Sequence, residues 1–358
     1  MIAIDGHLDL SMNALSWNRD LTKSVFEIRR DEVGMTEKGR AMGTVAFPEM
    51  RSGEVALSLA TLIARVKRDG GGGLDSATLL YYRSHDIAYA VAQGQLAYYR
   101  VLESEGQVRI IKDLKTLDAH ISEWEKSAPK DQSLGFIISM EGADPITRPD
   151  QVESWWEDGL RVVGLSHYGV SAYAHGTGTS GGLTLLGKPL LKAMESVGMI
   201  LDVTHLADQS FFEAMDAFGG PVLASHNNCR ALVPGDRQFT DEQIRLIIER
   251  GGVIGAAMDA WMLYPSWVRG KTKPEVVSLA AFVDHIDHVC QVAGNAAHSA
   301  IGTDLDGGYG REQCPHDLDT IADLQKIPDL LRKRGYSEDD IKSIMHGNWL
   351  RFFRKAWG

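Results

Sequence analysis

The feature that most constrains the fold is an alternation of short, β-branched apolar runs with longer amphipathic stretches. Such alternation is typical of repeated strand–helix units around a parallel sheet. Eight apolar runs are predicted core strands, at residues 2–5, 43–47, 134–140, 161–166, 199–204, 221–225, 252–257 and 299–303. Eight such units in one chain predict an α/β fold of the (β/α)8 TIM-barrel type.

The predicted helices lie between these strands, at residues 76–105, 188–197, 241–249 and 273–293, and a further one at 337–355 closes the chain. Thr240 and Gln243 form a capping-box pattern at the start of one helix. No shift in composition divides the chain, so we expect residues 1–358 to form a single domain. A typical barrel has about 250 residues, which leaves roughly 100 for loop insertions and extra C-terminal helices.

Two smaller segments fall outside the eight units. The run VRIIKD at residues 108–113 predicts a short extra strand before an edge helix. Four consecutive glycines at residues 70–73 predict a flexible turn in an insertion after the second strand.

Charge and composition argue against several classes of function. The chain has 37 basic and 48 acidic residues, a net charge of −11, whereas nucleic-acid binding needs clustered Lys and Arg. Asp5, His7 and Asp9 interrupt the first apolar run, which therefore does not resemble a signal peptide, and no segment approaches ~20 uninterrupted apolar residues. Three scattered cysteines fit free thiols better than a disulfide framework. We therefore expect a cytoplasmic protein without nucleic-acid or membrane partners.

Polar side chains follow the apolar runs at the point where each predicted strand ends. The residues at six strand ends are His7 with Asp9, Glu141, His167, His205, His226 and Asp304. One histidine at a strand end is more often a hydrogen-bonded structural residue than a metal ligand. Six strands ending in His, Asp or Glu are harder to explain by packing, because charged groups at a barrel rim repel each other unless a ligand offsets the cost.

The types of these residues indicate which metal ions could bind at this rim. Imidazole and carboxylate groups together suit zinc, although manganese and cobalt tolerate the same set. A carboxylate can also bridge two ions ~3.5–4 Å apart, which allows a binuclear hydrolytic site. Such a site requires no nucleophilic serine or cysteine.

The chain resembles the membrane dipeptidase (renal dipeptidase) family in five segments, in this order: DGHLD, SMEG, DVTH, ASHNN and GTDLDGG. This family comprises zinc peptidases of the amidohydrolase superfamily, so the resemblance implies an amidohydrolase-type barrel with two zinc ions. It implies that His7 and Asp9 bind one ion, that His205 and His226 bind the other, and that Glu141 bridges them. It also implies a homodimer.

The same resemblance assigns the remaining roles. His167 would polarise the scissile carbonyl, Arg237 would hold the free carboxylate of a dipeptide, and Asp304 would bind the substrate amine and carry the proton. The residue chemistry agrees, because a hydroxide held between two divalent ions can attack an amide carbonyl and His167 can stabilise the charge that develops. Asp304 can then carry a proton to the leaving amine.

The predicted activity is hydrolysis of dipeptides, L-Xaa-D-Xaa dipeptides among them, and two departures from the family leave the substrate open. The first motif reads DGHLDLS where the family commonly has DGHND followed by proline, and YGVSAYAHGTGTSGGL follows His167 in place of a loop with asparagine and an acidic residue. Alternatives on the same centre are N-acyl-D-amino acid deacylation and lactam or lactone hydrolysis. A non-catalytic binding barrel is a further alternative, although all the expected ligands are present.

Other polar residues have a more ordinary explanation. His175, before GTGTSGG, fits a flexible loop beside the pocket better than a phosphate-binding loop, because the Walker lysine is missing. His285 and His288 fit the outward face of an amphipathic helix better than a metal pair. Arg230 is the rival of Arg237 as the carboxylate ligand, unless it pairs with an acidic neighbour. The aromatic stretch MDAWMLYPSW suggests a pocket wall, a dimer contact or core packing with similar weight.

Overall fold

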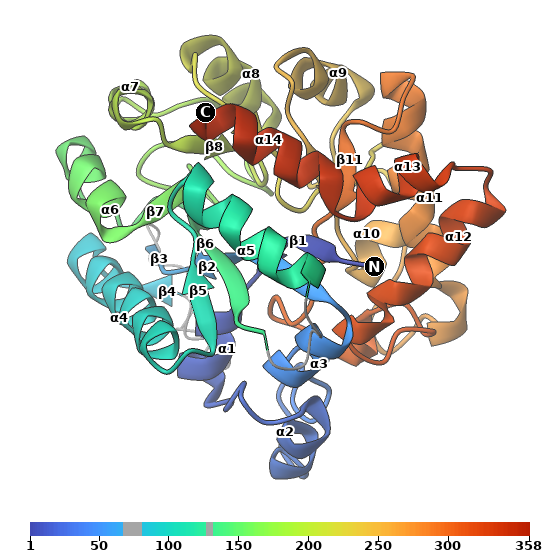
Figure 1. Cartoon of the computed structure of the whole chain (residues 1–358). Helices are drawn as coiled ribbons and strands as arrows, with labels where there is room; N and C mark the ends of the chain where they lie inside the picture. The colour runs from blue at the N-terminus through green and yellow to red at the C-terminus, as the bar shows by residue number, and fades with distance from the viewer. Residues whose placement is uncertain (67–80, 127–131) are drawn as a thin grey trace.

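The structure is a computed structural model that describes residues 1–66, 81–126 and 132–358. Its main sheet is parallel, with the strand order β10-β11-β1-β2-β6-β7-β8-β9. These strands are β1 (Ala3–Leu8), β2 (Val55–Leu62), β6 (Leu134–Met140), β7 (Leu160–Gly164), β8 (Ile200–Asp202), β9 (Val222–Leu223), β10 (Ile254–Ala256) and β11 (Ser299–Ile301). A bridge between Ala224 and Ile254 connects the two ends of this order. The sheet is therefore a nearly closed eight-stranded barrel, which confirms the predicted fold class (Figure 1).

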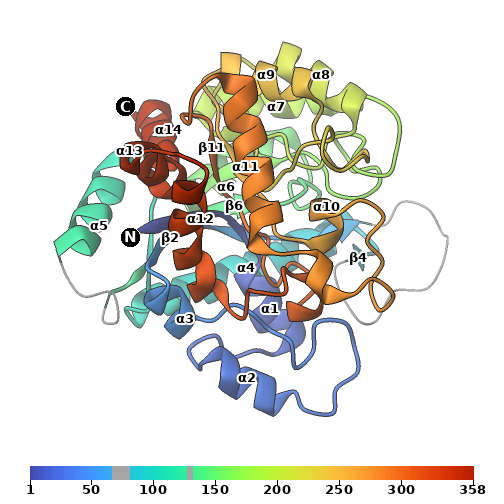
Figure 2. The same ribbon diagram turned by 90° about the vertical axis from the view of Figure 1, so that its right-hand side faces the viewer.

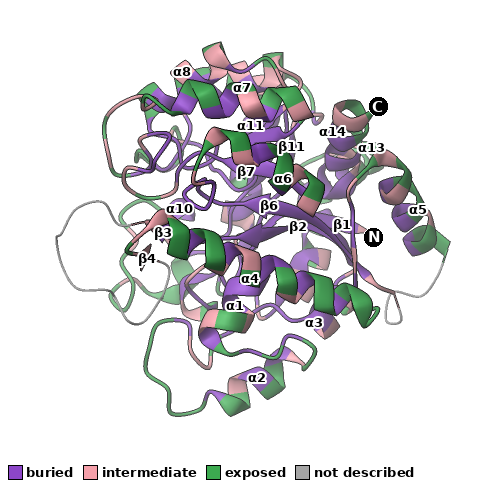
Figure 3. Ribbon diagram, turned by 90° about the vertical axis from the view of Figure 1, so that its left-hand side faces the viewer, coloured by how far each residue is buried: buried purple, intermediate pink, exposed green. Residues whose placement is uncertain are grey.

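The helices surround the barrel (Figures 1 and 2). In the described part of the chain they are α1 (Leu10–Trp17), α2 (Val25–Asp31), α3 (Phe47–Ser52), α4 (His85–Ser104), α5 (Leu114–Lys126), α6 (Val152–Asp158), α7 (Gly187–Val197), α8 (Asp208–Ala217), α9 (Asp241–Glu249), α10 (Ala260–Leu263), α11 (Leu279–Ala293), α12 (Ile327–Lys333), α13 (Glu338–Lys342) and α14 (Asn348–Trp357). The predicted capping box at Thr240 and Gln243 is present at the start of α9. The buried faces of these helices point toward the sheet and their exposed faces point outward (Figure 3).

The prediction for the second strand was wrong. Residues 43–47 are buried, but residues 43–46 are a loop and Phe47 begins α3, and the strand is β2 at Val55–Leu62. The backbone N–H groups of Thr44 and Val45 donate to the carboxylate of Asp306 and do not join the sheet. Pro48 then occupies the first turn of α3, where its fixed φ favours a helix. The apolar run therefore predicted burial correctly, but it did not form a strand.

The two smaller segments have different outcomes. The extra strand expected at residues 108–113 is present as β5 (Val108–Ile110), which pairs with β6 and precedes α5. The turn expected at residues 70–73 lies outside the described residues.

The C-terminal helix α14 closes one end of the barrel. Trp349 and Phe353 of α14 pack with strand residues such as Ile4 and Val162 in one buried cluster. The indole N–H of Trp349 donates to the carbonyl of Ile301, at 2.9 Å. Figure 2 shows α14 on the same side of the molecule as the N-terminus, with α10 on the opposite side. The barrel interior is therefore packed at its N-terminal end, and a cavity can form only toward the other end.

Within the described residues, the stretch Pro274–Ala293 is long and apolar enough to cross a membrane, with 20 residues and a mean hydropathy of 1.2. No such segment was predicted from the sequence. The apolar residues of this stretch have a role in the barrel, because Phe282, Ile286 and Val289 of α11 lie in the main hydrophobic core. Length and composition alone therefore say nothing about a membrane here.

Candidate metal centre

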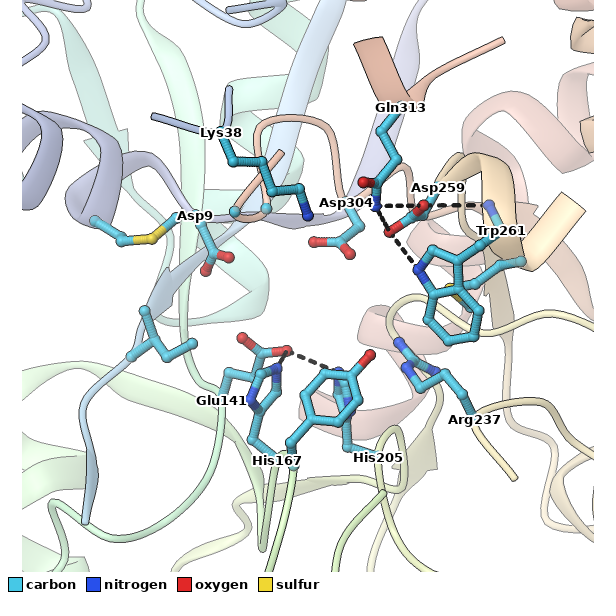
Figure 4. Close-up of a pocket in the computed structure, with 16 residues that line it drawn as sticks. Asp9, Lys38, Glu141, His167, His205, Arg237, Asp259, Trp261, Asp304 and Gln313 are labelled. Atoms are coloured by element: carbon cyan, nitrogen blue, oxygen red, sulfur yellow. Dashed lines mark hydrogen bonds and ion pairs between the residues drawn. The ribbon is translucent and has the colours of Figure 1, made fainter. Parts of the chain in front are cut away.

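The site residues predicted from the strand ends meet at the C-terminal end of the barrel. His7 is near the end of β1 and Glu141 directly follows β6, whereas His205, His226 and Asp304 each lie three residues beyond their strands. Parallel strands bring all their carboxyl ends to one rim, so side chains distant in sequence face a common space. That space is a cavity of about 280 Å³, into which the labelled side chains of Figure 4 point.

Glu141 occupies the centre of the site. Its Oε1 lies 3.1 Å from His205 Nε2 and 3.3 Å from both His226 Nε2 and His167 Nε2. Its Oε2 lies 3.7 Å from His7 Nε2. The two oxygens of one carboxylate thus face different groups of donors, which is the geometry that a bridging ligand needs.

Three overlapping groups of donor atoms could each hold an ion, with all atoms of a group within 4.8 Å of one another. They are His7, Glu141 and His226; Glu141, His167 and His205; and His7, Asp9 and Asp304. The pairs expected to share an ion are adjacent, with 3.7 Å between His7 Nε2 and Asp9 Oδ1 and 3.2 Å between the Nε2 atoms of His205 and His226.

The donor atoms fit a metal ion because several of them are buried without a protein partner. In the described residues, His7 Nε2 and Asp9 Oδ1 are buried and make no hydrogen bond. A buried polar atom without a partner is costly unless a ligand binds it. The far nitrogens of two histidines are held by hydroxyl groups, His226 Nδ1 by Ser225 Oγ at 2.8 Å and His205 Nδ1 by Thr177 Oγ1 at 3.1 Å. These contacts turn each Nε2 toward the site.

Burial and the neighbouring charges shift the pKa values of the donor groups. Burial holds the pKa values of His205 and His226 well below the ordinary value, so both rings are neutral, the form that binds metal. Burial also raises the pKa of Glu141 to about 7. For His7 burial alone would lower the pKa, but Glu141, Asp9 and Asp304 raise it to about 10. The three carboxylates therefore stabilise a positive charge at this position.

Asp304 lies beside the donors and is partly accessible from the cavity. Its Oδ1 is 3.8 Å from His7 Nε2, and burial raises its pKa well above the ordinary value. Its backbone has a φ of 58°, a left-handed conformation that residues other than glycine rarely adopt. His205 has a φ of 68°. Such conformations concentrate at functional sites, where the surrounding structure maintains them.

Of the two candidate carboxylate ligands, only Arg237 lines the cavity. It donates to Asn227 Oδ1 at 2.6 Å and to the carbonyl of His226 at 2.9 Å, and the described residues leave its other three N–H groups available. Arg230 instead pairs with Asp208, at 2.7 Å between its NH2 and Asp208 Oδ1.

The cavity and its immediate surroundings also contain residues that we did not assign to the site from the sequence. Trp261 and Asp259, from the aromatic stretch after β10, line the wall, and Gln313 Nε2 donates to both Asp259 oxygens at 2.9 Å. Lys38 enters from the loop between α2 and α3, for which the sequence has no signal. Arg65 donates to His167 Nδ1 and lies three residues beyond β2. A correct placement of the second strand would therefore have found Arg65.

The other candidate histidines do not belong to the site. His175 is absent from the donor groups found among the described residues. The prediction that His285 lies on an outward face was wrong, because it is buried in α11 and its Nδ1 accepts the backbone N–H of Cys229 at 3.0 Å. Burial lowers its pKa to about 3, so it is a neutral structural residue. His288 is half-buried and its Nε2 contacts Asp241 Oδ1 at 2.8 Å.

The fold and this donor set define the class of metal-dependent (β/α)8-barrel hydrolases. Comparison with known families makes the assignment narrower. Residues 1–357 match the family described as Membrane dipeptidase (Peptidase family M19), and the chain belongs to this family.

Individual relatives are more distant. A protein of Klebsiella pneumoniae described as "Uncharacterized protein in pqqA 5'region" is 28% identical over 239 residues, which cover 64% of this chain and 84% of that protein. Dipeptidase aclJ of Aspergillus oryzae is 28% identical over 61% of this chain and 50% of its own length. The chain thus spans about half the length of that dipeptidase.

Solved structures share the fold over the full chain. A metallo peptidase from Rhodobacter sphaeroides, liganded with a phosphinate mimic of the dipeptide L-Ala-D-Ala, has a TM-score of 0.79 at 20% identity, with 100% of this chain and 99% of that chain covered. The probable dipeptidase PvdM from Pseudomonas aeruginosa has a TM-score of 0.79 at 18% identity, with 100% and 96% covered. These similarities support the (β/α)8-barrel fold.

Proposed function

We propose that the protein is a dipeptidase with two divalent metal ions, taken here to be zinc, that cleaves dipeptides with a free C-terminal carboxylate. The observation that carries the proposal is the position of Glu141, whose two oxygens face separate donors within a cavity that Arg237 also lines. His7 and Asp9 would hold one ion and His205 and His226 the other, with Glu141 shared between them. Membership of the dipeptidase family supports the reaction class.

The reaction needs a nucleophile and a polarised carbonyl. When bound, two divalent ions would lower the pKa of the attacking water, so that it can give up a proton near neutral pH. The chain supplies the polarising group in His167. Because Arg65 donates to its Nδ1, the proton of the neutral ring is on Nε2, which faces Glu141 Oε1 and can donate to the substrate oxygen. That hydrogen bond strengthens as negative charge develops on the oxygen.

Asp304 moves the proton in the proposed reaction. The attacking water forms the new C–O bond and gives up a proton, which the Asp304 carboxylate accepts. The C–N bond then breaks and Asp304 returns the proton to the leaving amine. Its raised pKa suits a carboxyl group that must carry a proton between two steps.

We assign the two charged ends of the substrate to two residues, the C-terminal carboxylate to Arg237 and the amine to Asp304. Arg237 offers its free N–H groups to the C-terminal carboxylate, since a planar guanidinium binds carboxylates through two parallel bonds. We include L-Xaa-D-Xaa dipeptides among the substrates, in line with the ligand of the Rhodobacter sphaeroides protein. A homodimer and a cytoplasmic location remain predictions from the sequence.

The test is hydrolysis of L-L dipeptides, L-D dipeptides and N-acyl-D-amino acids by the zinc-loaded protein, with metal content measured on the same sample. Turnover of dipeptides at about two metals per chain supports the proposal. Two metals with activity only on acylated amino acids would preserve the metal centre and replace the reaction by deacylation. A preparation that binds no zinc after chelation and reloading would contradict the metal centre itself.

A further inference from the structure

Lys38 is a charged residue of the cavity to which the proposed reaction gives no role. It lies in the loop between α2 and α3 and lines the same cavity as Arg237 and Asp304. Figure 4 shows its side chain entering from the side opposite His167 and His205, with its nitrogen directed into the cavity. Any substrate that fills the cavity will therefore meet this ammonium group.

The Lys38 ammonium forms no hydrogen bond and no ion pair in the chain as described (residues 1–66, 81–126 and 132–358). The ring of Tyr309 lies below it, with 5.7 Å from Nζ to the ring centroid. Asp259 is near enough to influence its charge but is already bonded to Gln313 and to the indole N–H of Trp261, at 2.7 Å. Three N–H donors of Lys38 are thus available to a ligand.

The backbone on the C-terminal side of Lys38 is fixed by a buried ion network. Arg19 NH2 donates to the carbonyl of Gly39 at 2.7 Å, and the Gly39 N–H donates to Glu312 Oε1 at 3.0 Å. Arg19 is itself held by Glu32, at 2.8 and 3.0 Å, and Glu32 also binds Arg40 at 2.8 Å. The fold therefore presents Lys38 at the cavity from an anchored segment and not from a free tip.

We propose that Lys38 binds a second carboxylate of the substrate, so that the site prefers dipeptides with an acidic side chain. The inference rests on the proposed dipeptidase function. There Arg237 takes the terminal carboxylate and Asp304 the amine, which leaves the side chains as the only other charged groups of a dipeptide. An unpaired ammonium attracts an acidic side chain and repels a basic one.

The test compares substrates that differ only in that charge. Alanyl-glutamate is compared with alanyl-glutamine, and glutamyl-alanine with glutaminyl-alanine, each in the L,L and L,D forms, on the zinc-loaded full chain. For at least one order of residues we expect kcat/KM to favour glutamate over glutamine about 10- to 100-fold, mainly through KM, as hydrogen bonds to charged groups imply. Lys38→Met should bring that ratio close to one, and Lys38→Arg should restore part of it.

A matched control is Lys192→Met, which removes an exposed lysine of α7 away from the cavity and should leave the ratio unchanged. The proposal is overturned if the wild type does not distinguish glutamate from glutamine. It is also overturned if Lys38→Met lowers kcat/KM for the glutamate and glutamine substrates by the same factor, because Lys38 then acts on a step common to all dipeptides.

Binding measured by calorimetry separates this inference from the proposed function. If no dipeptide is cleaved, the dipeptidase proposal fails, and alanyl-glutamate and alanyl-glutamine are titrated into the zinc-loaded wild type and Lys38→Met. Tighter binding of the glutamate form that disappears in the variant supports the role of Lys38. Equal affinities in both proteins refute it.

Discussion

Arg237 gives the sharpest test of the substrate end of the site. We expect Arg237→Met to abolish the preference for a free C-terminal carboxylate over a C-terminal amide. Two hydrogen bonds between charged groups contribute about 1.5–3 kcal/mol each, and the lower part of that range gives about 3–4 kcal/mol for the pair. At 1.4 kcal/mol for each factor of ten, kcat/KM for a free dipeptide should fall roughly 100- to 1,000-fold.

The same substitution has a second, structural effect. Arg237 donates to Asn227 Oδ1 and to the carbonyl of His226, both of them buried, so methionine leaves two acceptors without a donor. Each costs about 1–3 kcal/mol of stability. The assay therefore reports the ratio of kcat/KM for a dipeptide to that for its C-terminal amide, because general damage to the protein lowers both terms and cancels.

Arg230→Met is the matched control. Its guanidinium pairs with Asp208 at a partly exposed position outside the cavity, where an ion pair contributes little. We expect the acid-to-amide ratio of this variant to equal that of the wild type. An Arg237→Met protein that keeps the wild-type ratio, or an Arg230→Met protein that loses it, would refute the assignment of the carboxylate to Arg237.

Three further predictions concern the metal centre and the fold. Glu141→Gln should lower zinc content and activity together, since an amide lacks the charge and the second equivalent oxygen of the carboxylate that two of the three donor groups share; metal analysis after reloading that gives wild-type content would remove Glu141 from the site. His285 is neutral and buried, with a pKa lowered to about 3, so its contribution to the free energy of unfolding is complete above pH 6.5 and falls with decreasing pH. At pH 4.5 the protein should have lost about 3 kcal/mol of this free energy. In urea melts between pH 4.5 and 7, the stability of His285→Gln should depend less on pH than that of the wild type. Asp306→Asn breaks a buried charge network with Arg19 and Thr44 and should lower the free energy of unfolding by about 3–5 kcal/mol, whereas a change below 1 kcal/mol would show that the network contributes little.

The barrel and its donors could be predicted because both follow from local patterns. A strand buried on both faces is a continuous apolar run, and in a parallel barrel the residues just beyond each run share one rim. His205 and His226 could therefore be predicted to lie together because each follows a strand of the same parallel barrel, although the residues between them give no indication of this contact. The prediction of the second strand failed because two apolar runs, residues 43–47 and Val55–Leu62, both fit a strand. The backbone of the first run bonds to Asp306 and not to the sheet, and such a tertiary contact cannot be predicted from the local pattern.

The residues that escaped prediction are those whose position depends on contacts between distant segments. Lys38 reaches the cavity because an ion network holds its loop, and Gln313 does so from a short helical turn at Arg311–Gln313. Neither belongs to a repeating pattern. His285 shows the converse error, because the polarity of a histidine suggested exposure while its hydrogen bond to the backbone of Cys229 allows burial.

The segment GTDLDGG connects the metal centre with the loop that presents Lys38. Asp304 faces the cavity while Asp306, two residues later, accepts the N–H groups of Thr44 and Val45 and pairs with Arg19. Both aspartates have left-handed backbones, with φ values of 58° and 60°. A Cβ at Gly307 would lie 2.8 Å from the backbone oxygen of Asp304 and would also displace its carboxylate, so the turn favours glycine there. One tight turn after β11 therefore positions Asp304, the proposed proton carrier. Through Arg19 it also holds the loop of Lys38, the residue that we propose binds the substrate side chain.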